Sequence, residues 1–327
     1  MDLLDRLRLD VPVCQAGMGG GLAGPELAAA VAEAGALGTL GLAPPGELRR
    51  SIVRVRECAP GRAVAVNLLT PFLRRSQVSV CVDEGVDAAV VAFGGDRGLV
   101  EELRGAGVFV LVMVGTDDQA RRAVSWGADA LIAQGGEAGG HLSGTTGALQ
   151  FLPRALAVAD GRPVLLAGGI ATGADTRAAM AAGADGVVAG TRFLLTRESR
   201  AHPLYQRRVL DADRTIRTTL FGLGWPAPHR VIPNAATERW CHRDGTSKAA
   251  ARMLTGGSAF LARLPATTAT VRMQTTRLPL FTPIAPTVGM PASAIDRTAC
   301  YAGQSALRMT SVTSAREAVS DLSPGGH

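Results

Sequence analysis

The stretch AAGADGVVAGT, residues 181–191, decides how this chain folds. Its alanine-rich start is typical of a helix, and Gly183 stands where a helix commonly ends. The short apolar run that follows is typical of a strand buried on both faces of a parallel sheet. The same order recurs in four other stretches, which indicates a repeated helix-to-strand unit. These stretches begin at Glu33, Asp83, Arg104 and Trp126.

Three further apolar runs raise the number of predicted strands to eight. They begin at Val11, Arg62 and Arg162, and all eight strand starts lie roughly 20 to 34 residues apart, the length of one strand-helix unit. A helix is predicted to begin at Pro25, because proline favours the first helical position. Eight such units in sequence predict an α/β fold, a closed (β/α)8 TIM barrel over residues 1–195. An open, doubly wound sheet is the alternative.

The strand pattern breaks after Phe193. Residues 196–275 are polar and arginine-rich, and they predict a small helical appended subdomain that acts as a lid or substrate subdomain. Residues 276–327 predict a third part of the chain. Four prolines within 278–291 indicate an irregular path, and a last helix over 304–319 is expected to return to the barrel.

The composition argues against several classes of protein. With 47% hydrophobic and 19% charged residues, the chain can bury a large core and is not predicted to be disordered. Aromatic residues, at 4%, leave few surfaces for stacking bases, so we expect no nucleic-acid partner. The five cysteines form no CxxC pair, which favours neither a disulfide framework nor a metal site. Without a signal-peptide pattern or an apolar run of about 18 residues, we expect a cytoplasmic protein and no membrane partner.

Residues at the carboxyl ends of the predicted strands are the candidates for function, because the active sites of TIM barrels lie there. The seventh strand runs into Gly168 and Gly169, and the eighth runs into Gly190 and Thr191. Loops after these two strands commonly bind phosphate, and glycine lets backbone N–H groups approach an anion closely. The four residues therefore predict a phosphate site, whereas any one of the glycines alone would fit a simple tight turn.

Three other strand ends carry residues suited to a planar heterocycle. The sixth strand leads into QGGEAGGH, which places His141 in a glycine-rich loop at the barrel mouth. A histidine there suits a general base, although a lone histidine is commonly structural. The first strand ends near Met18, and the third ends at Asn67, whose amide needs partners that ring nitrogens and carbonyls would supply. Together with the phosphate site, these residues predict a mononucleotide cofactor such as FMN.

These motifs resemble those of the nitronate monooxygenase family, formerly called 2-nitropropane dioxygenases, and of the related FMN-dependent enoyl-acyl carrier protein reductases. The resemblance covers nearly the whole chain, and it implies a barrel with a helical subdomain and FMN at the strand ends. The segments that carry it are PVCQAGMGGGLAGPELAAAVAEAGALGTLG from Pro12, Val66-Asn67, AQGGEAGGH ending at His141, PVLLAGGIATG, GADGVVAGTRFLLTRES and YAGQS from Tyr301.

The resemblance also implies a role for each matching residue. His141 matches the catalytic histidine of the family. One position departs from the pattern, because Gly17 stands where the family usually has proline in a QAPM motif, which loosens the first loop. The residues expected to bind the cofactor are Ala16, Gly17, Met18, Asn67, Gln134, Gly139, Gly140, Gly168, Gly169, Gly190 and Thr191.

The favoured function is that of a flavin-dependent oxidoreductase of the nitronate monooxygenase type. It would use FMN and O2 to oxidise alkyl nitronates or nitroalkanes to carbonyl compounds and a nitrogen oxide, with His141 as catalytic base or substrate-orienting group. The net charge of +6 mildly favours an anionic substrate. The expected partners are a small-molecule substrate and O2, and a homodimer is compatible with this function.

One alternative keeps the fold and FMN but changes the reaction. In it, NAD(P)H reduces an enoyl thioester of acyl carrier protein or CoA. Such an enzyme needs a basic patch for its acidic substrate carrier, which Arg207, Arg208, Arg214 and Arg217 would offer. A run of this kind is more commonly a solvated helix face.

Two further alternatives belong to other classes. A flavin-binding protein without turnover would not need an acid-base group, so His141 argues against it. An inosine-monophosphate dehydrogenase-like enzyme needs a cysteine in the loop after strand six, and no cysteine lies between Cys81 and Cys241. The sequence therefore excludes an enzyme of that kind.

Overall fold

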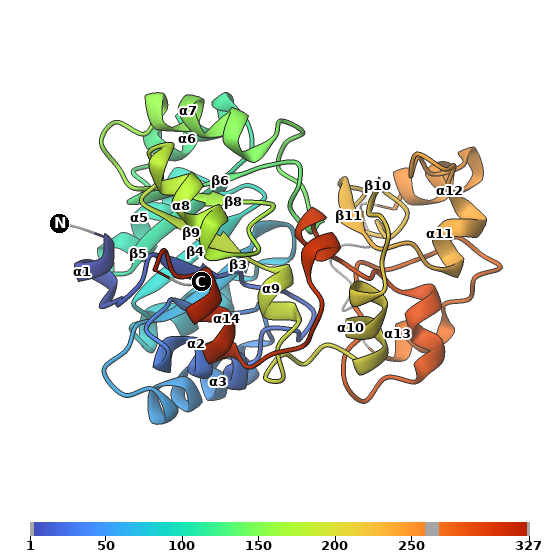
Figure 1. Ribbon diagram of the computed structural model, residues 1–327, viewed down its shortest axis with the longest axis horizontal. Coiled ribbons are helices and arrows are strands. Elements are labelled where there is room, and N and C mark those ends of the chain that lie inside the picture. Colours follow the sequence, from blue (N-terminus) through green and yellow to red (C-terminus); the bar gives the residue numbers. More distant parts are fainter. Residues whose placement is uncertain (1–2, 259–267, 326–327) are drawn as a thin grey trace.

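The computed structural model describes residues 3–258 and 268–325, and it confirms the predicted barrel (Figure 1). Eight parallel strands form one sheet in the order β1-β9-β8-β6-β5-β4-β3-β2. A parallel bridge between Cys14 and Leu37 joins the two edge strands, so the sheet closes on itself. The strands are β1 (Val13–Gln15), β2 (Gly38–Leu40), β3 (Val64–Leu69), β4 (Ala88–Ala92), β5 (Phe109–Val114), β6 (Ala130–Gln134), β8 (Val164–Ala167) and β9 (Gly186–Ala189).

Helices alternate with the strands and cover the outside of the barrel (Figure 1). Helix α2 begins at Pro25 as predicted, and the side chain of Thr116 caps α6 by accepting the N–H of Gln119. The helices of this part are α1 (Leu3–Leu7), α2 (Pro25–Glu33), α3 (Pro45–Cys58), α4 (Arg75–Asp83), α5 (Arg97–Gly105), α6 (Asp117–Ser125), α7 (Ala148–Val158), α8 (Gly173–Ala181) and α9 (Thr191–Leu194), with a 3-10 turn η1 (Thr70–Phe72).

The repeated glycine has the conformation that the pattern predicts. All five glycines that follow the helices in the repeats have a positive φ, which reverses the chain at little cost only for glycine. The apolar runs after them are buried strands; every residue of β4, for example, is buried. The glycines and their φ angles are Gly35 (87°), Gly85 (55°), Gly107 (81°), Gly127 (88°) and Gly183 (100°).

The segment that follows the barrel contains short helices and, in addition, two strands that were not predicted. The first of them pairs antiparallel with the second, and the second pairs antiparallel with a two-residue strand, β7 (Gly140–His141), so that the order is β10-β11-β7. The loop after β6 is thereby built into the sheet of the appended segment. The boundaries at residues 195 and 275 stay predictions. The elements are α10 (Pro203–Leu210), β10 (Ile216–Thr218), β11 (His229–Val231), α11 (Ala235–Trp240), α12 (Ala249–Gly256) and α13 (Thr268–Met273).

The C-terminal part returns to the barrel, but by a path more broken than expected. Residues 278–291 contain no helix or extended strand, in keeping with their prolines. The helix expected over 304–319 is split into η4 (Gln304–Arg308) and α14 (Ala315–Leu322), with η3 (Ala292–Arg297) preceding both. Ser314 separates the two pieces because its side chain caps α14 by accepting the N–H of Glu317. Helix α14 packs against α2 and α8.

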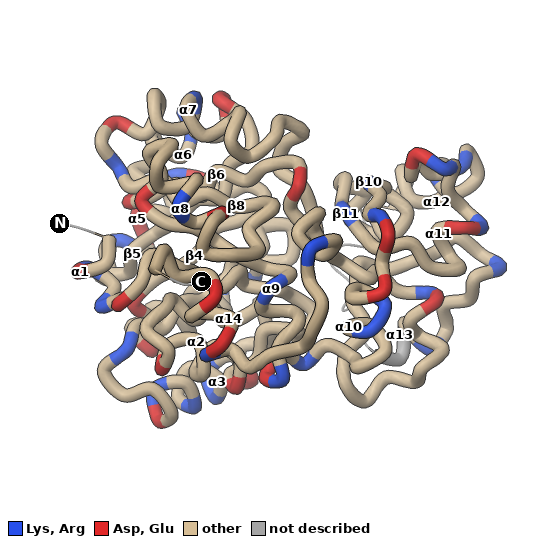
Figure 2. Tube along the Cα trace, in the orientation of Figure 1, with Lys and Arg blue, Asp and Glu red and all other residues tan. Residues whose placement is uncertain are grey.

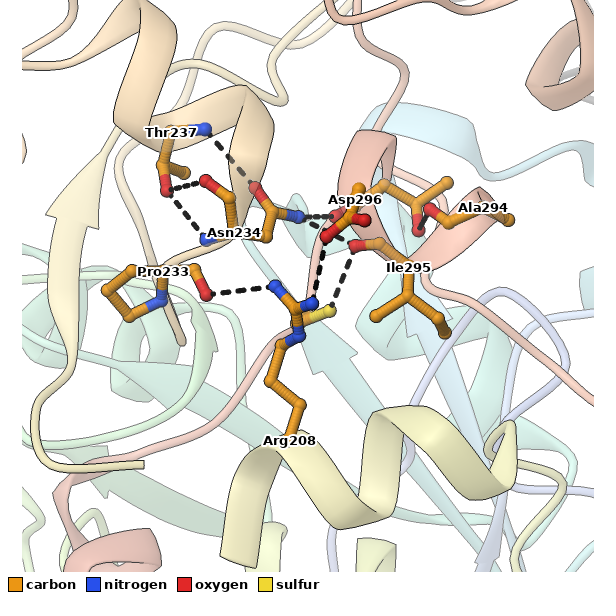
Figure 3. A network of polar contacts seen from close by, with 9 residues as sticks. Arg208, Pro233, Asn234, Thr237, Ala294, Ile295 and Asp296 are labelled. Atoms are coloured by element: carbon orange, nitrogen blue, oxygen red, sulfur yellow. Dashed lines mark hydrogen bonds and ion pairs between the residues drawn. The ribbon is translucent and has the colours of Figure 1, made fainter. Parts of the chain in front are cut away.

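Charged residues of both signs are interspersed along the chain (Figure 2). In the appended segment, Arg207 pairs with Asp211 at 2.9 Å, and Arg208 pairs with Asp296 at 2.8 Å. Figure 3 shows the second pair within a network in which Nδ2 of Asn234 donates to two backbone carbonyls. These contacts join α10 and α11 to η3. No helix within the described ranges is long and apolar enough to cross a membrane.

Candidate active site

A cavity of about 490 Å³ lies at the carboxyl ends of the barrel strands, within the roughly 300–1,000 Å³ of small-molecule sites. All twelve residues predicted for the site line this cavity, so residues far apart in the sequence meet at one place. Their individual roles stay predictions. They are Ala16, Gly17, Met18, Asn67, Gln134, Gly139, Gly140, His141, Gly168, Gly169, Gly190 and Thr191.

Gly17, the departure from the family pattern, lies directly against Asn67. Nδ2 of Asn67 donates to the carbonyl of Gly17 at 2.7 Å. A Cβ atom added at Gly17 would lie 2.1 Å from the Cβ of Asn67 and 3.0 Å from Cγ2 of Thr39. No side chain fits there without movement, so glycine at this position lets the first loop pack onto β3.

We therefore expect Gly17→Ala to lower the free energy of unfolding by about 1–3 kcal/mol, the usual cost of overpacking. Urea unfolding followed by circular dichroism measures the change. The control is Gly105→Ala in α5, where an added Cβ meets nothing within 4 Å and alanine favours the helix. If Gly17→Ala is as stable as the wild type, the first loop does not pack onto β3 as closely as the structure shows.

Hydrogen bonds hold the loop after β6 in one shape. Nε2 of Gln134 donates to the carbonyl of His141 at 3.1 Å, and its Oε1 accepts the N–H of Ser143 at 2.7 Å. Gln134 thus fixes the loop, besides any contact with a cofactor. The buried Arg230 of β11 donates from Nε to the carbonyl of Gly136 at 3.1 Å. The histidine is therefore held where the barrel meets the appended sheet.

The imidazole of His141 lies inside an aromatic shell without a hydrogen bond. Its Nε2 is buried and has no partner among the described residues. The indole of Trp225 stacks on it, with ring centroids 3.8 Å apart and planes at 19°. Burial, and to a lesser extent the neighbouring His229, holds the pKa of His141 well below its usual 6.5. At pH 7 the imidazole is therefore neutral and able to accept a proton.

Aromatic side chains gather in this cavity although only 4% of the chain is aromatic. Phe72 and Phe93 meet Trp225 edge-on, with ring centroids 5.3 and 5.0 Å from its own. Tyr205 and Tyr301 also line the cavity. None of these five side chains was predicted for the site. The signal for Phe72 and Phe93 was available, because they follow β3 and β4 at the functional end of the barrel.

His229 lies beside His141, and both of its ring nitrogens form hydrogen bonds. Its Nδ1 meets the carbonyl of Ala227 at 3.0 Å, and its Nε2 accepts the N–H of Phe221 at 3.4 Å. Those two bonds require the neutral ring. Burial lowers the pKa of His229 to about 4, against a usual 6.5. His229 is thus a structural neighbour of the candidate base.

This lowered pKa predicts acid sensitivity. In the unfolded chain His229 is protonated below about pH 6.5, whereas in the folded chain it is protonated only below about pH 4. The free energy of unfolding therefore falls as the pH drops from 6.5 to 4. The loss from this residue is on the order of 3 kcal/mol. Urea unfolding at several pH values should show a smaller pH dependence for His229→Gln, whereas the exposed His242→Gln should behave like the wild type. Equal pH dependence in all three proteins would contradict the assignment.

The rim at the ends of β8 and β9 fits a phosphate group. Gly168 and Gly169 have φ angles of 113° and 77°, in the region that favours glycine. An added Cβ at Gly190 would have no neighbour closer than 3.6 Å, so the rim leaves space above it. Oγ1 of Thr191 accepts the N–H of Gly303 at 2.9 Å, which packs the YAGQS segment against the rim. Glycine loops with such space suit close approach of backbone donors to an anion.

The cavity lining is uncharged. Among the described residues that line it, none is Asp, Glu, Lys or Arg. The basic surplus of the chain, from which an anionic substrate was expected, therefore has no counterpart among these lining residues. Apolar side chains dominate the lining, which suits the apolar parts of a bound ligand.

Comparison with known proteins extends this description. A family model described as nitronate monooxygenase matches residues 2–72 and 56–325. A curated relative from Mycobacterium tuberculosis is named (3aS,4S,5R,7aS)-5-hydroxy-7a-methyl-1-oxo-octahydro-1H-indene-4-carboxyl-CoA dehydrogenase. It is 38% identical over 245 residues, which are 72% of this chain and 67% of the relative.

Two solved structures cover nearly the whole chain. FabK from Thermotoga maritima is 27% identical with a TM-score of 0.78, over 98% of this chain and 94% of that one. Nitroalkane oxidase from Streptomyces ansochromogenes is 28% identical with a TM-score of 0.77, over 98% of this chain and 96% of that one. Both likenesses span the barrel together with the appended segment.

Proposed function

The chain belongs to the nitronate monooxygenase family and is a flavin-dependent oxidoreductase, and we propose that it uses FMN and O2 to oxidise nitroalkanes and alkyl nitronates to carbonyl compounds and a nitrogen oxide. One observation carries the proposal. The imidazole of His141 is neutral, its Nε2 has no hydrogen-bond partner among the described residues, and it lines a glycine-rimmed cavity whose described lining holds no charged side chain. That arrangement suits removal of a proton from an uncharged carbon acid.

The residues of the cavity fit FMN. Its phosphate would lie at Gly168, Gly169, Gly190 and Thr191, where the rim leaves space for it. Asn67 retains an Oδ1 atom without a protein partner among the described residues, available to a ring N–H. When bound, FMN would supply the capacity to take electrons from the substrate and pass them to O2. A single phosphate site at the ends of β8 and β9 favours the mononucleotide over FAD.

In the proposed reaction, the side chains of the protein would remove one proton from the substrate. His141 would take it from the carbon next to the nitro group, because the neutral form of the ring is the one able to accept. Gln134 and Arg230 would keep that ring at the mouth by holding its loop. The surrounding aromatic side chains exclude water, which strengthens electrostatic interactions within the site.

A thioester substrate is the second candidate, favoured by the CoA dehydrogenase that is 38% identical to this chain. The carbon next to a thioester carbonyl also carries an acidic proton, so His141 would serve the same purpose. The arginine patch invoked for a carrier is partly occupied, since Arg207 and Arg208 pair with carboxylates. This candidate therefore has support from relatedness more than from the basic patch.

Flavin analysis and anaerobic reduction test the proposal. We expect the purified protein to be yellow and to release FMN, not FAD, on denaturation. Without oxygen, a nitroalkane or nitronate should bleach the bound flavin, and oxygen should restore the colour. Bleaching by an acyl-CoA would favour the second candidate, and bleaching by NAD(P)H followed by turnover of an enoyl thioester would favour the reductase. A colourless protein that takes up no FMN would refute the cofactor.

A further inference from the structure

Trp225 lies closer to the ring of His141 than the other aromatic rings around it. The centroid distance is 3.8 Å, against 5.0 Å for His229 and 5.5 Å for Tyr301. Trp225 belongs to the GWPAPHR loop of the appended segment, outside the barrel. The N–H of Gly224, next to it, donates to Oγ of Ser258 at 2.9 Å, which anchors the loop.

Two phenylalanine side chains of the barrel also contact the indole. Phe72 meets it with the ring planes at 84°, and Phe93 meets it at 67°. Phe93 adopts a φ of 62°, a left-handed conformation that costs free energy for a non-glycine residue. Backbone strain at a residue that contacts the indole indicates that its placement serves the site. The indole is thus held nearly parallel to the imidazole by parts of both the barrel and the appended segment.

No carboxylate in the described chain balances a positive charge on His141. Of the titratable groups on neighbouring elements, His229 and Tyr301 are held neutral by burial. Glu137 turns its carboxylate to the N–H at the start of α7, at 2.9 Å. Arg230 donates a hydrogen bond to the carbonyl of Gly136, in the loop that carries the histidine. The face of the indole, which is the ring stacked on the imidazole, is therefore placed to stabilise a proton on it.

We propose that Trp225 is a positioning residue that orients the imidazole of His141 and stabilises the imidazolium formed when it takes a proton. The face of an indole carries partial negative charge, and its attraction for a cation is strongest where water is excluded. Trp225 would thus act in the place that a carboxylate commonly takes beside a catalytic histidine. The proposal rests on the proposed function only in that His141 accepts the substrate proton.

Titration of His141 by NMR tests this without turnover. Flavin-loaded protein with ¹³C-labelled histidine would be titrated as wild type, Trp225→Leu and Trp225→Phe, with His141→Gln to assign the signal. We expect the pKa of His141 to fall by about one pH unit in Trp225→Leu and by less in Trp225→Phe, which keeps a π face. Trp240→Leu, which removes an indole of the appended segment outside the cavity, should leave the pKa unchanged. Flavin content and circular dichroism show that each variant is folded.

An unchanged or raised pKa in Trp225→Leu would overturn the proposal, because Trp225 would then only exclude water. A wild-type ring that stays neutral down to the acid limit of folding would overturn it as well. Kinetics give a second readout: kcat/KM for a neutral nitroalkane should fall about 3- to 10-fold in Trp225→Leu, and less for a preformed nitronate. Failure of every nitro compound to react would refute the proposed function but leave the NMR comparison intact.

Discussion

His141→Ala is expected to keep its flavin and to lose a factor of about 10² to 10⁴ in kcat/KM for a neutral nitroalkane, the usual contribution of a general base. A neutral substrate must give up a proton bound to carbon. Within the described part of the cavity, His141 is the lining side chain that is neutral at pH 7 and has a ring nitrogen without a hydrogen-bond partner. Neighbouring His229 cannot substitute, because both its ring nitrogens are engaged.

Activity with a preformed nitronate distinguishes the two roles considered for His141, catalytic base and substrate-orienting group. The nitronate arrives without that proton, so the loss of kcat/KM should be much smaller for it. Oxygen consumption with both substrate forms, in wild type and variant, gives the comparison. His242→Ala, at an exposed position outside the cavity, controls for loss of a histidine. Equal losses with both forms would mean that His141 orients the substrate, and no loss with either would remove it from the mechanism.

The barrel was predictable from the sequence because its signals are local. A helix that ends at a glycine such as Gly183 and leads into a short apolar strand specifies one unit within about a dozen residues, and the unit is repeated. The carboxyl ends of parallel strands then meet at one face whatever the details of packing. For this reason, the strand pattern placed residues as distant as Met18 and Thr191 at one end of the barrel, and in the structure both line one cavity.

The aromatic shell depends on long-range pairing, which the sequence does not reveal. Strand β7 has only two residues, and it exists because His141 lies opposite His229 in an antiparallel pair. A strand of two residues is too short to show the alternation of polar and apolar residues from which strands are predicted. Trp225 reaches the site through the same appended segment, so its role was hidden together with the sheet. The bond of Gln134 to the loop backbone spans only seven residues, but it depends on how that loop folds back, which the sequence does not reveal either.

The packing around Gly17 could not be predicted from the sequence for a third reason. The departure from the family pattern was visible in the sequence and suggested a looser first loop. In the structure the loop is instead packed tightly, because the missing side chain makes room for Asn67. A glycine can signal flexibility or close approach, and only the neighbouring atoms distinguish the two.

Gly190→Val is expected to abolish flavin binding while the barrel remains folded. Gly190 has a φ of −107°, which any residue can adopt, and an added Cβ has 3.6 Å of clearance from its nearest neighbour. The protein alone therefore has room for a Cβ atom here. The proposed phosphate does not tolerate a valine side chain, because the two methyl groups would occupy the space through which backbone donors approach it. We expect at least a 100-fold loss of FMN affinity, or about 2.7 kcal/mol.

Gly190 is a better position than Gly169 for this experiment, because the loss of flavin must be separable from misfolding. Valine at Gly169, where φ is 77°, would strain the backbone, so a loss of flavin there could not be separated from misfolding. Gly46→Val is the matched control, because its added Cβ also has 3.6 Å of clearance but lies on α3, outside the cavity. FMN titration followed by fluorescence, with circular dichroism for the fold, measures both proteins. If Gly190→Val binds FMN as tightly as Gly46→Val does, the phosphate lies elsewhere, and the assignment of Gly168, Gly169 and Thr191 falls with it.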